Sequence, residues 1–205
     1  MLSGGKGMRA NEKVLRFAAI LKEGGIARSK VCPISTEAFA SLSEEFLQRA
    51  RRRKEECGVD AQQVLAEATA IYERLKTYDL SSIHALLETV NSRIKDARSP
   101  GRVVYPVHIV HMVIMIARCF NLNSANEIAA FYNGYNLILQ LLIPGMPSPC
   151  NFISGATIKL VRTLSPQRDA EQLYEELYPS IKTITDDLFS FKPQLNVIIG
   201  DNGNN

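Results

Sequence analysis

The chain has 205 residues, of which 46% are hydrophobic and 22% charged, and its formal net charge is +3. This balance is that of an ordinary globular protein, and a net charge so small does not by itself indicate a nucleic-acid partner. The charge is unevenly distributed, because residues 1–60 carry 12 Lys/Arg against 8 Asp/Glu and residues 161–205 carry 4 against 7. The excess of positive charge in residues 1–60 is compatible with a positively charged binding surface in that part of the chain.

The N-terminal region shows no export signal and no metal-binding pattern. Residues 11–22 are predicted to form an amphipathic helix that ends before Gly24. Within it, the apolar stretch 17–21 is too short for the apolar region of a signal peptide. None of the four cysteines lies at metal-ligand spacing from another. We therefore expect reduced thiols and a cytoplasmic location.

Residues 36–57 are predicted to form a long helix with a strongly basic end. The basic residues are Arg49, Arg51, Arg52, Arg53 and Lys54. Cations favour the C-terminal end of a helix dipole, so a solvated helix end explains part of this run, and a phosphate-binding patch is the alternative. Gly58 ends the helix and Asp60 begins the next, with apolar residues at helical spacing up to residue 75. The two helices are predicted to form an antiparallel hairpin.

A third helix, capped by Ser81 or Ser82, is predicted over residues 83–94. The polar link that follows, 95–101, contains proline and glycine and is the best candidate for a domain boundary. We therefore predict a helical region of unknown role over 1–95, a helical domain over 96–192 and a short remainder over 193–205.

The most apolar helix is predicted over residues 107–120, with Pro106 in its first turn. At about 14 residues this helix is too short to cross a bilayer, which needs about 20, and it is typical of a buried central helix. Ser124 and Glu127 have the capping-box spacing and begin the next helix, which breaks at residues 133–134. A short helix over 135–143 follows.

Ser148 and Pro149 predict a helix over residues 150–164, and a similar Ser-Pro pair predicts another over 167–178. The apolar, β-branched segment 195–199 is predicted to be a strand. Helices 124–133, 135–143 and 149–164 could form a helix-turn-helix-like unit or a plain helical core. In the first case the last helix offers polar groups for base or phosphate contacts, namely Asn151, Ser154, Thr157 and Lys159.

Two sets of side chains could suggest metal chemistry. His108 and His111 lie three residues apart on the apolar helix, but no acidic or cysteine partner has supporting spacing. We therefore interpret both as hydrogen-bonded or partly exposed histidines. Asp186 and Asp187 are interpreted as a polar helix end.

Several motifs in residues 80–201 occur in a fixed order. They are DARSPGRVVYP at 96–106, NEIAAF at 126–131, MPSPCNF at 146–152, a leucine-tyrosine pair at 173–174 and VIIGD at 197–201. Together they resemble the N-terminal region of DDE transposases of the H-repeat-associated type. That resemblance implies that 96–192 is a helical transposase-associated domain and that 193–205 is a remnant or the first strand of an RNase H-like catalytic domain. It also implies that Asp201 corresponds to the first catalytic aspartate. Here Gly200 precedes Asp201, and Asn202 and Gly203 follow it, in departure from the family pattern.

The expected fold is therefore mainly α, a multi-helical bundle with one short C-terminal β-strand. The resemblance implies a non-catalytic DNA-binding or assembly module of a truncated transposase, with a protein-interaction or dimerisation module as the alternative. Two-metal chemistry needs more carboxylates than Asp201, so we expect no cofactor, and a divalent metal only with a full catalytic domain. The expected partners are DNA, a second copy or full-length transposase, and no membrane. The candidate DNA contacts are Arg49, Arg51, Arg52, Arg53, Lys54, Arg102, Asn151, Lys159 and Arg162.

Overall fold

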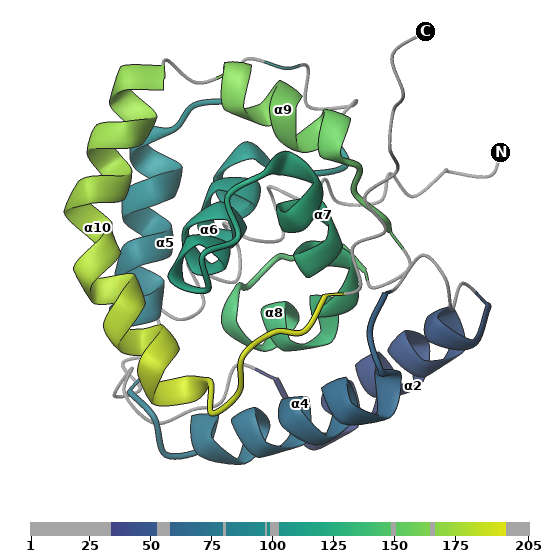
Figure 1. Cartoon of the computed structure of the whole chain (residues 1–205). Helices are drawn as coiled ribbons and strands as arrows, with labels where there is room; N and C mark the ends of the chain where they lie inside the picture. Colours follow the sequence, from purple (N-terminus) through teal and green to yellow (C-terminus); the bar gives the residue numbers. More distant parts are fainter. Residues whose placement is uncertain are drawn as a thin grey trace, which may run out of the picture.

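The computed structural model describes residues 34–52, 58–79, 81–96, 98, 103–148, 151–164 and 167–195. These residues form eight α-helices and no β-strand, which confirms the predicted mainly α fold for the described part. The helices are α2 (Thr36–Arg52), α4 (Ala61–Leu75), α5 (Ser81–Arg93), α6 (Val107–Cys119), α7 (Ala125–Gly134), α8 (Asn136–Leu142), α9 (Gly155–Leu164) and α10 (Gln167–Leu188) (Figure 1).

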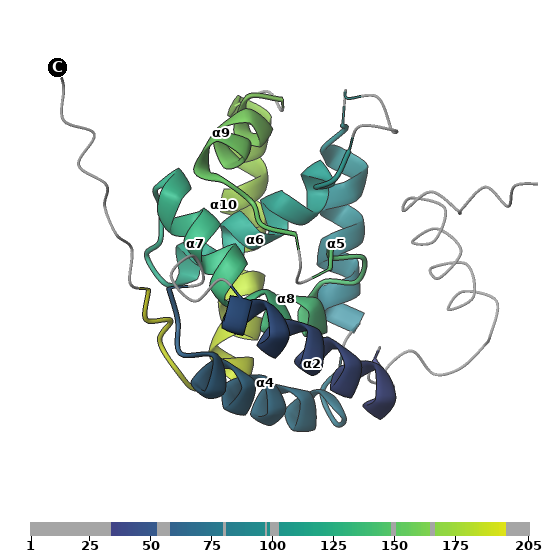
Figure 2. The same ribbon diagram turned by 90° about the vertical axis from the view of Figure 1, so that its right-hand side faces the viewer.

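Helices α6 and α8 form the centre of the bundle. Every residue of α6 from Val107 to Ala117 is buried, as the continuous apolar run predicts, and α8 is buried along almost its whole length. Helices α5 and α10 lie side by side against α6, while α4 packs against α8 (Figure 1). Helix α9 lies at the end of the bundle opposite α4 (Figure 2).

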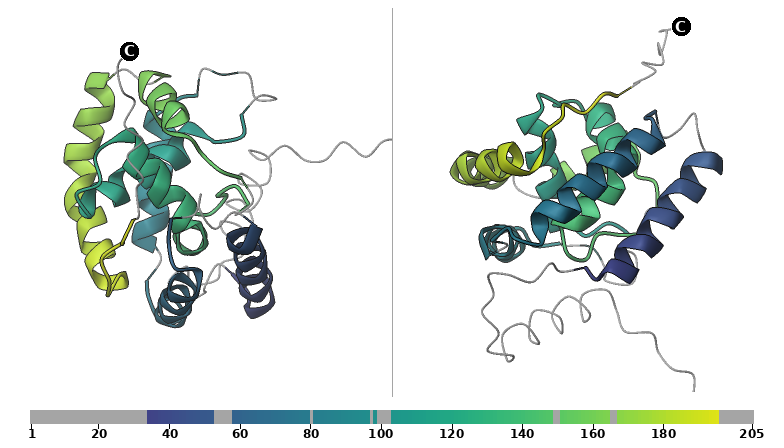
Figure 3. Two further views of the ribbon diagram at one scale, coloured as in Figure 1. Left: turned by 45° about the vertical axis from the view of Figure 1, so that its right-hand side comes forward. Right: turned by 90° about the horizontal axis from the view of Figure 1, so that it is seen from below.

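Helices α2 and α4 pack against each other at the lower edge of the bundle, as the predicted hairpin requires (Figure 3). Their buried side chains join the same hydrophobic core as those of the later helices. That core includes Phe46 and Leu75 from one side of the 95–101 link and Val110 and Leu139 from the other. The described helices of the predicted regions 1–95 and 96–192 thus share one core.

The structure confirms several caps that the sequence predicts. The Asp60 side chain accepts hydrogen bonds from the backbone N–H groups of residues 62 and 63 at the start of α4. Ser124 and Glu127 form the complete capping box at the start of α7. Neither predicted serine caps α5 through its side chain. Instead, Asp79 Oδ1 accepts a hydrogen bond from the Ser81 N–H over 2.9 Å.

Two helix boundaries differ from the prediction. Helix α9 begins at Gly155 and not at residue 150, because the Ser154 side chain accepts a hydrogen bond from the Thr157 N–H and caps the helix there. Helix α10 continues ten residues past Tyr178, through Pro179. The proline leaves the carbonyl oxygen of Glu175 without its N–H donor, but Glu175 is exposed, so water can bond that carbonyl.

Several predictions fall on residues outside the described ranges. They concern the helix over 11–22, the end of the helix over 36–57, the 195–199 strand beyond its first residue, and the side chains of Arg53, Lys54, Arg102 and Asp201.

Candidate nucleic-acid interface

Three of the predicted DNA-contacting cations are fully at the surface. Arg51 and Arg52 are exposed at the C-terminal end of α2, and Lys159 is exposed on α9. None of the three makes a hydrogen bond or ion pair in the part of the chain that the structure describes. They are therefore available to an external acceptor.

Other surface cations have acidic partners within the bundle. Lys76 pairs with Glu73, Arg93 with Glu176, Arg98 with Asp96 and Lys182 with Asp186. The Arg98–Asp96 pair is partly buried, whereas the other three are exposed pairs, which typically add 0–1 kcal/mol. Two of the exposed pairs place a cation against a carboxylate of the acidic α10.

Arg49 corrects one expectation, because it is only 5% exposed and cannot serve as a surface contact for phosphate. Its guanidinium donates a hydrogen bond to the Asn133 carbonyl oxygen. The Cζ atom lies 5.1 Å from the ring centroid of Phe46 and 4.9 Å from that of Phe152. Stacking and hydrogen bonding make Arg49 a structural link between α2, the end of α7 and residue 152. We call this contact the Arg49 junction.

The segment before α9 is fixed at the same junction. The Asn133 side chain donates to the Ile153 carbonyl oxygen and accepts from the Ile153 N–H, both over 2.9 Å. Ser148 also donates to Glu45 Oε2 on α2 over 3.2 Å. These bonds place the basic end of α2 beside the segment that leads into α9 and contains the exposed Asn151.

The outward face of α9 carries the remaining candidates. Ile158 and Val161 are buried, so the opposite side of the helix presents Lys159, Leu160 and Thr163. Ser154 and Thr157, which the sequence offered as base contacts, form the α9 cap and also bond each other over 3.0 Å. In the described structure these two hydroxyls therefore have a local role.

Arg162 is half-buried and donates a hydrogen bond to the Asn123 carbonyl oxygen over 3.0 Å. It lies near a second arginine, Arg118, whose Cζ is 4.5 Å from the ring centroid of Tyr174. Burial lowers the pKa of Arg162, and the neighbouring charge of Arg118 lowers it further. We call the contact of Arg118, Arg162, Tyr174 and His111 the Arg118 junction.

The two histidines of α6 are both buried, and for His111 the hydrogen-bonded alternative of the prediction holds. His111 is 0% exposed and forms a hydrogen bond through Nδ1 with the Tyr174 hydroxyl. Burial, followed by the charges of Arg162 and Arg118, lowers the pKa of His111 to about 4. Burial likewise raises the pKa of Tyr174 to about 12. His111 is therefore a neutral hydrogen-bonding group at pH 7.

No group of three or more His, Cys, Asp or Glu side chains is arranged to hold a metal ion within the described ranges. Cys119 is a half-buried free thiol, and burial raises its pKa. The sequence signal that could have revealed the Arg118 junction was the interruption of the apolar helix by polar residues. Sequence reasoning placed Arg162 among the candidates and did not include Arg118.

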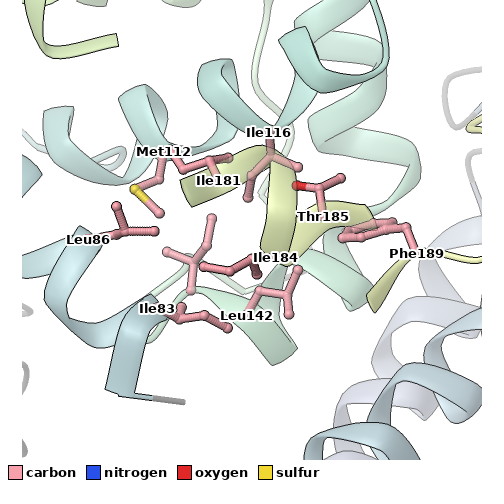
Figure 4. Close-up of a pocket in the computed structure, with 10 residues that line it drawn as sticks. Ile83, Leu86, Met112, Ile116, Leu142, Ile181, Ile184, Thr185 and Phe189 are labelled. Atoms are coloured by element: carbon pink, nitrogen blue, oxygen red, sulfur yellow. The ribbon is translucent and has the colours of Figure 1, made fainter. Parts of the chain in front are cut away.

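An apolar pocket lies between α5, α6, α8 and α10 (Figure 4). Ile83, Leu86, Met112 and Ile181 line it, and the Thr185 hydroxyl is a rare polar group on its wall. Its volume of ≈ 20 Å³ leaves room for about one water molecule, so it is too small for a substrate or cofactor.

Comparison of the chain with protein-family models, curated proteins and solved structures gave no match. Among the described helices, none has the length and apolar character needed to span a membrane. The candidate interface is therefore judged from its own geometry.

Proposed function

We propose that this chain is a DNA-binding or assembly module of a DDE transposase of the H-repeat-associated type, with no catalysis of its own. The context would be DNA transposition by a mobile element, and the motifs between residues 96 and 201 carry the resemblance. The structural observation that supports DNA binding is that Arg51, Arg52 and Lys159 are exposed and have no acidic partner among the described residues. Phosphate contacts by such cations supply most non-specific affinity for DNA.

The proposed absence of catalysis follows from the chemistry of the family. Two-metal phosphodiester cleavage needs several carboxylates around a pair of cations. The resemblance supplies Asp201 alone in this sequence. The module would therefore bind DNA, or assemble with a full-length transposase, without cutting DNA.

The test is the affinity of the full chain for a 20-base-pair duplex, measured by fluorescence anisotropy at several salt concentrations. Each phosphate contact adds about 0.9 to the slope of log affinity against log salt. The variant Arg51→Glu/Arg52→Glu should bind several-fold more weakly at low salt and show a shallower slope. The matched control is Lys95→Glu/Lys192→Glu, which changes the net charge equally at two other exposed lysines.

An equal loss of DNA affinity in the Arg51→Glu/Arg52→Glu variant and in the lysine control would mean that net charge, and not the end of α2, controls binding. Complete absence of salt-sensitive binding by the parent chain would reject the DNA-binding function.

The second candidate function is a protein-interaction or dimerisation module that does not touch DNA. It is favoured by Leu160, which is 50% exposed in the middle of the outward face of α9. A large exposed apolar side chain flanked by polar residues is compatible with a protein contact. Sedimentation of the parent chain and of Leu160→Glu tests this function, since a dimer that dissociates in the variant would support it.

A further inference from the structure

At the Arg118 junction the charges of Arg118 and Arg162 both act on Tyr174 and on His111. Arg118 lies in the last turn of α6 and Arg162 in the last turn of α9. Arg118 covers the Tyr174 ring, and Arg162 reaches the Asn123 carbonyl in the loop that follows α6. Both side chains are half-buried, so both keep some exposure to solvent.

Arg118 has no hydrogen-bond acceptor among the described residues. Its Nε atom is buried without a partner, and the guanidinium makes no ion pair. The carbonyl oxygens of Ala117 and Arg118 accept from the N–H groups of Phe120, Asn121 and Leu122, and no described carbonyl accepts from the Arg118 guanidinium. A guanidinium carries five N–H donors, and partly buried donors of this kind are normally bonded. The buried Nε cannot reach an external group, so the donors that Arg118 offers are the N–H groups of its two terminal nitrogens, which make no hydrogen bond to the described residues.

The electrostatic balance of the junction is positive. His111 is neutral, and among the described residues the acidic charge that acts on Tyr174 is that of Glu171, whose effect there is smaller than that of either arginine. The negative end of a helix dipole favours a cation by about 0.3–1 kcal/mol, which explains why an arginine ends each helix. It does not explain why two like charges meet without an acceptor between them.

We propose that Arg118 and Arg162 bind one oxyanion of the phosphate class at this junction. Two guanidinium groups match the charge and the several acceptor oxygens of a phosphate, to which arginine forms paired hydrogen bonds. In the bound module this oxyanion is a backbone phosphate of DNA, a step that rests on the proposed function. The oxyanion site itself does not depend on that step, because free phosphate has the same chemistry.

The first experiment measures thermal unfolding of the full chain in inorganic phosphate and in chloride at equal ionic strength. Phosphate should raise the midpoint of the parent chain relative to chloride, because a ligand that binds only the folded state stabilises it. The variants Arg118→Gln and Arg162→Gln should lose this shift. Lys192→Gln is the matched control, since it removes one positive charge from an exposed lysine outside the junction and should keep the shift.

If Arg118→Gln does not fold, Arg118→Lys and Arg162→Gln carry the test. Lysine keeps the charge but loses the planar fork, so it should retain only part of the phosphate shift. An equal response to phosphate and chloride in the parent chain would overturn the oxyanion site.

The second experiment distinguishes the source of the phosphate, with the same 20-base-pair duplex as the probe. Loss of one phosphate contact in Arg118→Gln/Arg162→Gln should reduce the salt slope by about 0.9 relative to the parent chain. An unchanged slope, with the phosphate shift present in the parent chain, would overturn the DNA assignment and leave a site for free phosphate. If the parent binds no DNA but shows the phosphate shift, the proposed function fails and the oxyanion site stands.

Discussion

The Arg49 and Arg118 junctions both place an arginine over an aromatic ring, yet they leave it in different states. Arg49 lies near two rings, bonds a backbone carbonyl and is almost completely buried. Arg118 covers one ring, remains half-buried and has no acceptor in the described structure. The comparison indicates that stacking alone does not make an arginine structural. Both arginines have a buried Nε that makes no hydrogen bond to the described residues, so what distinguishes Arg49 is its bond to a backbone carbonyl.

The largest expected effect is the loss of stability in Arg49→Ala. This change removes two ring contacts and leaves the Asn133 carbonyl oxygen unpaired in the core. A charged hydrogen bond is worth about 1.5–3 kcal/mol and a desolvated cation–π contact up to about 2, so we expect a loss of about 4 kcal/mol. Urea unfolding measures it, with the exposed Arg51→Ala as the control, for which we expect less than about 0.5 kcal/mol.

Arg118→Ala sharpens the same comparison, because it loses one ring contact and no hydrogen bond. We expect its cost to be about 1–2 kcal/mol. Equal losses for Arg49→Ala and Arg118→Ala would contradict the distinction between the two junctions.

The next largest effect is expected for Asn133→Ala, at the other half of the Arg49 junction. The change leaves both the N–H and the carbonyl oxygen of Ile153 without their partner. We expect a loss of about 3 kcal/mol in urea unfolding, because buried backbone groups are costly to leave unpaired. Asn151→Ala, at an exposed position two residues away from Ile153, is the control. A loss below about 1 kcal/mol would mean that water replaces the amide there.

The central helices could be predicted from the sequence because their signals are local. The apolar run of α6, the capping box at Ser124 and the cap at Asp60 each depend on residues within one or two turns. The start of α9 was misplaced because Ser148 and Pro149 form a plausible cap, and a second serine at 154 makes the actual one. No local pattern decides between them.

The candidate site was predictable only in part, for a physical reason. Arg49, Arg51 and Arg52 belong to one basic run, yet the burial of Arg49 depends on Phe152 and Asn133, about 100 and 84 residues away in the chain. The meeting of Arg118 with Arg162 likewise depends on the packing of three helices. Charge runs indicate where cations lie, whereas long-range packing decides which of them keep free donors.

A pH titration of stability tests the electrostatics of the Arg118 junction. The pKa of His111 is about 4 in the folded chain and about 6.5 when unfolded, so the unfolded state takes up the proton first as the pH falls. The free energy of unfolding is therefore unaffected by protonation of His111 above pH 6.5. It decreases as the pH falls from 6.5 towards 4, by an amount on the order of 3 kcal/mol.

Urea unfolding of the parent chain between pH 7 and pH 4 should therefore show a steeper loss than that of His111→Gln. Carboxylates contribute equally to both curves and cancel in the difference. Parallel curves would show that His111 is not held neutral by burial and the two arginines.

The smallest effect is expected for Tyr174→Phe, which separates the hydroxyl of the Arg118 junction from its ring. The hydroxyl bonds the buried His111, whereas the ring supports Arg118. Loss of one buried hydrogen bond should cost about 1 kcal/mol in urea unfolding, and Tyr178→Phe, at an exposed position on the same helix, should cost nothing measurable. Because phenylalanine keeps the ring under Arg118, the phosphate-dependent rise in unfolding temperature should remain. If that rise disappears with the hydroxyl, Tyr174 itself binds the oxyanion, and the two arginines alone do not form the site.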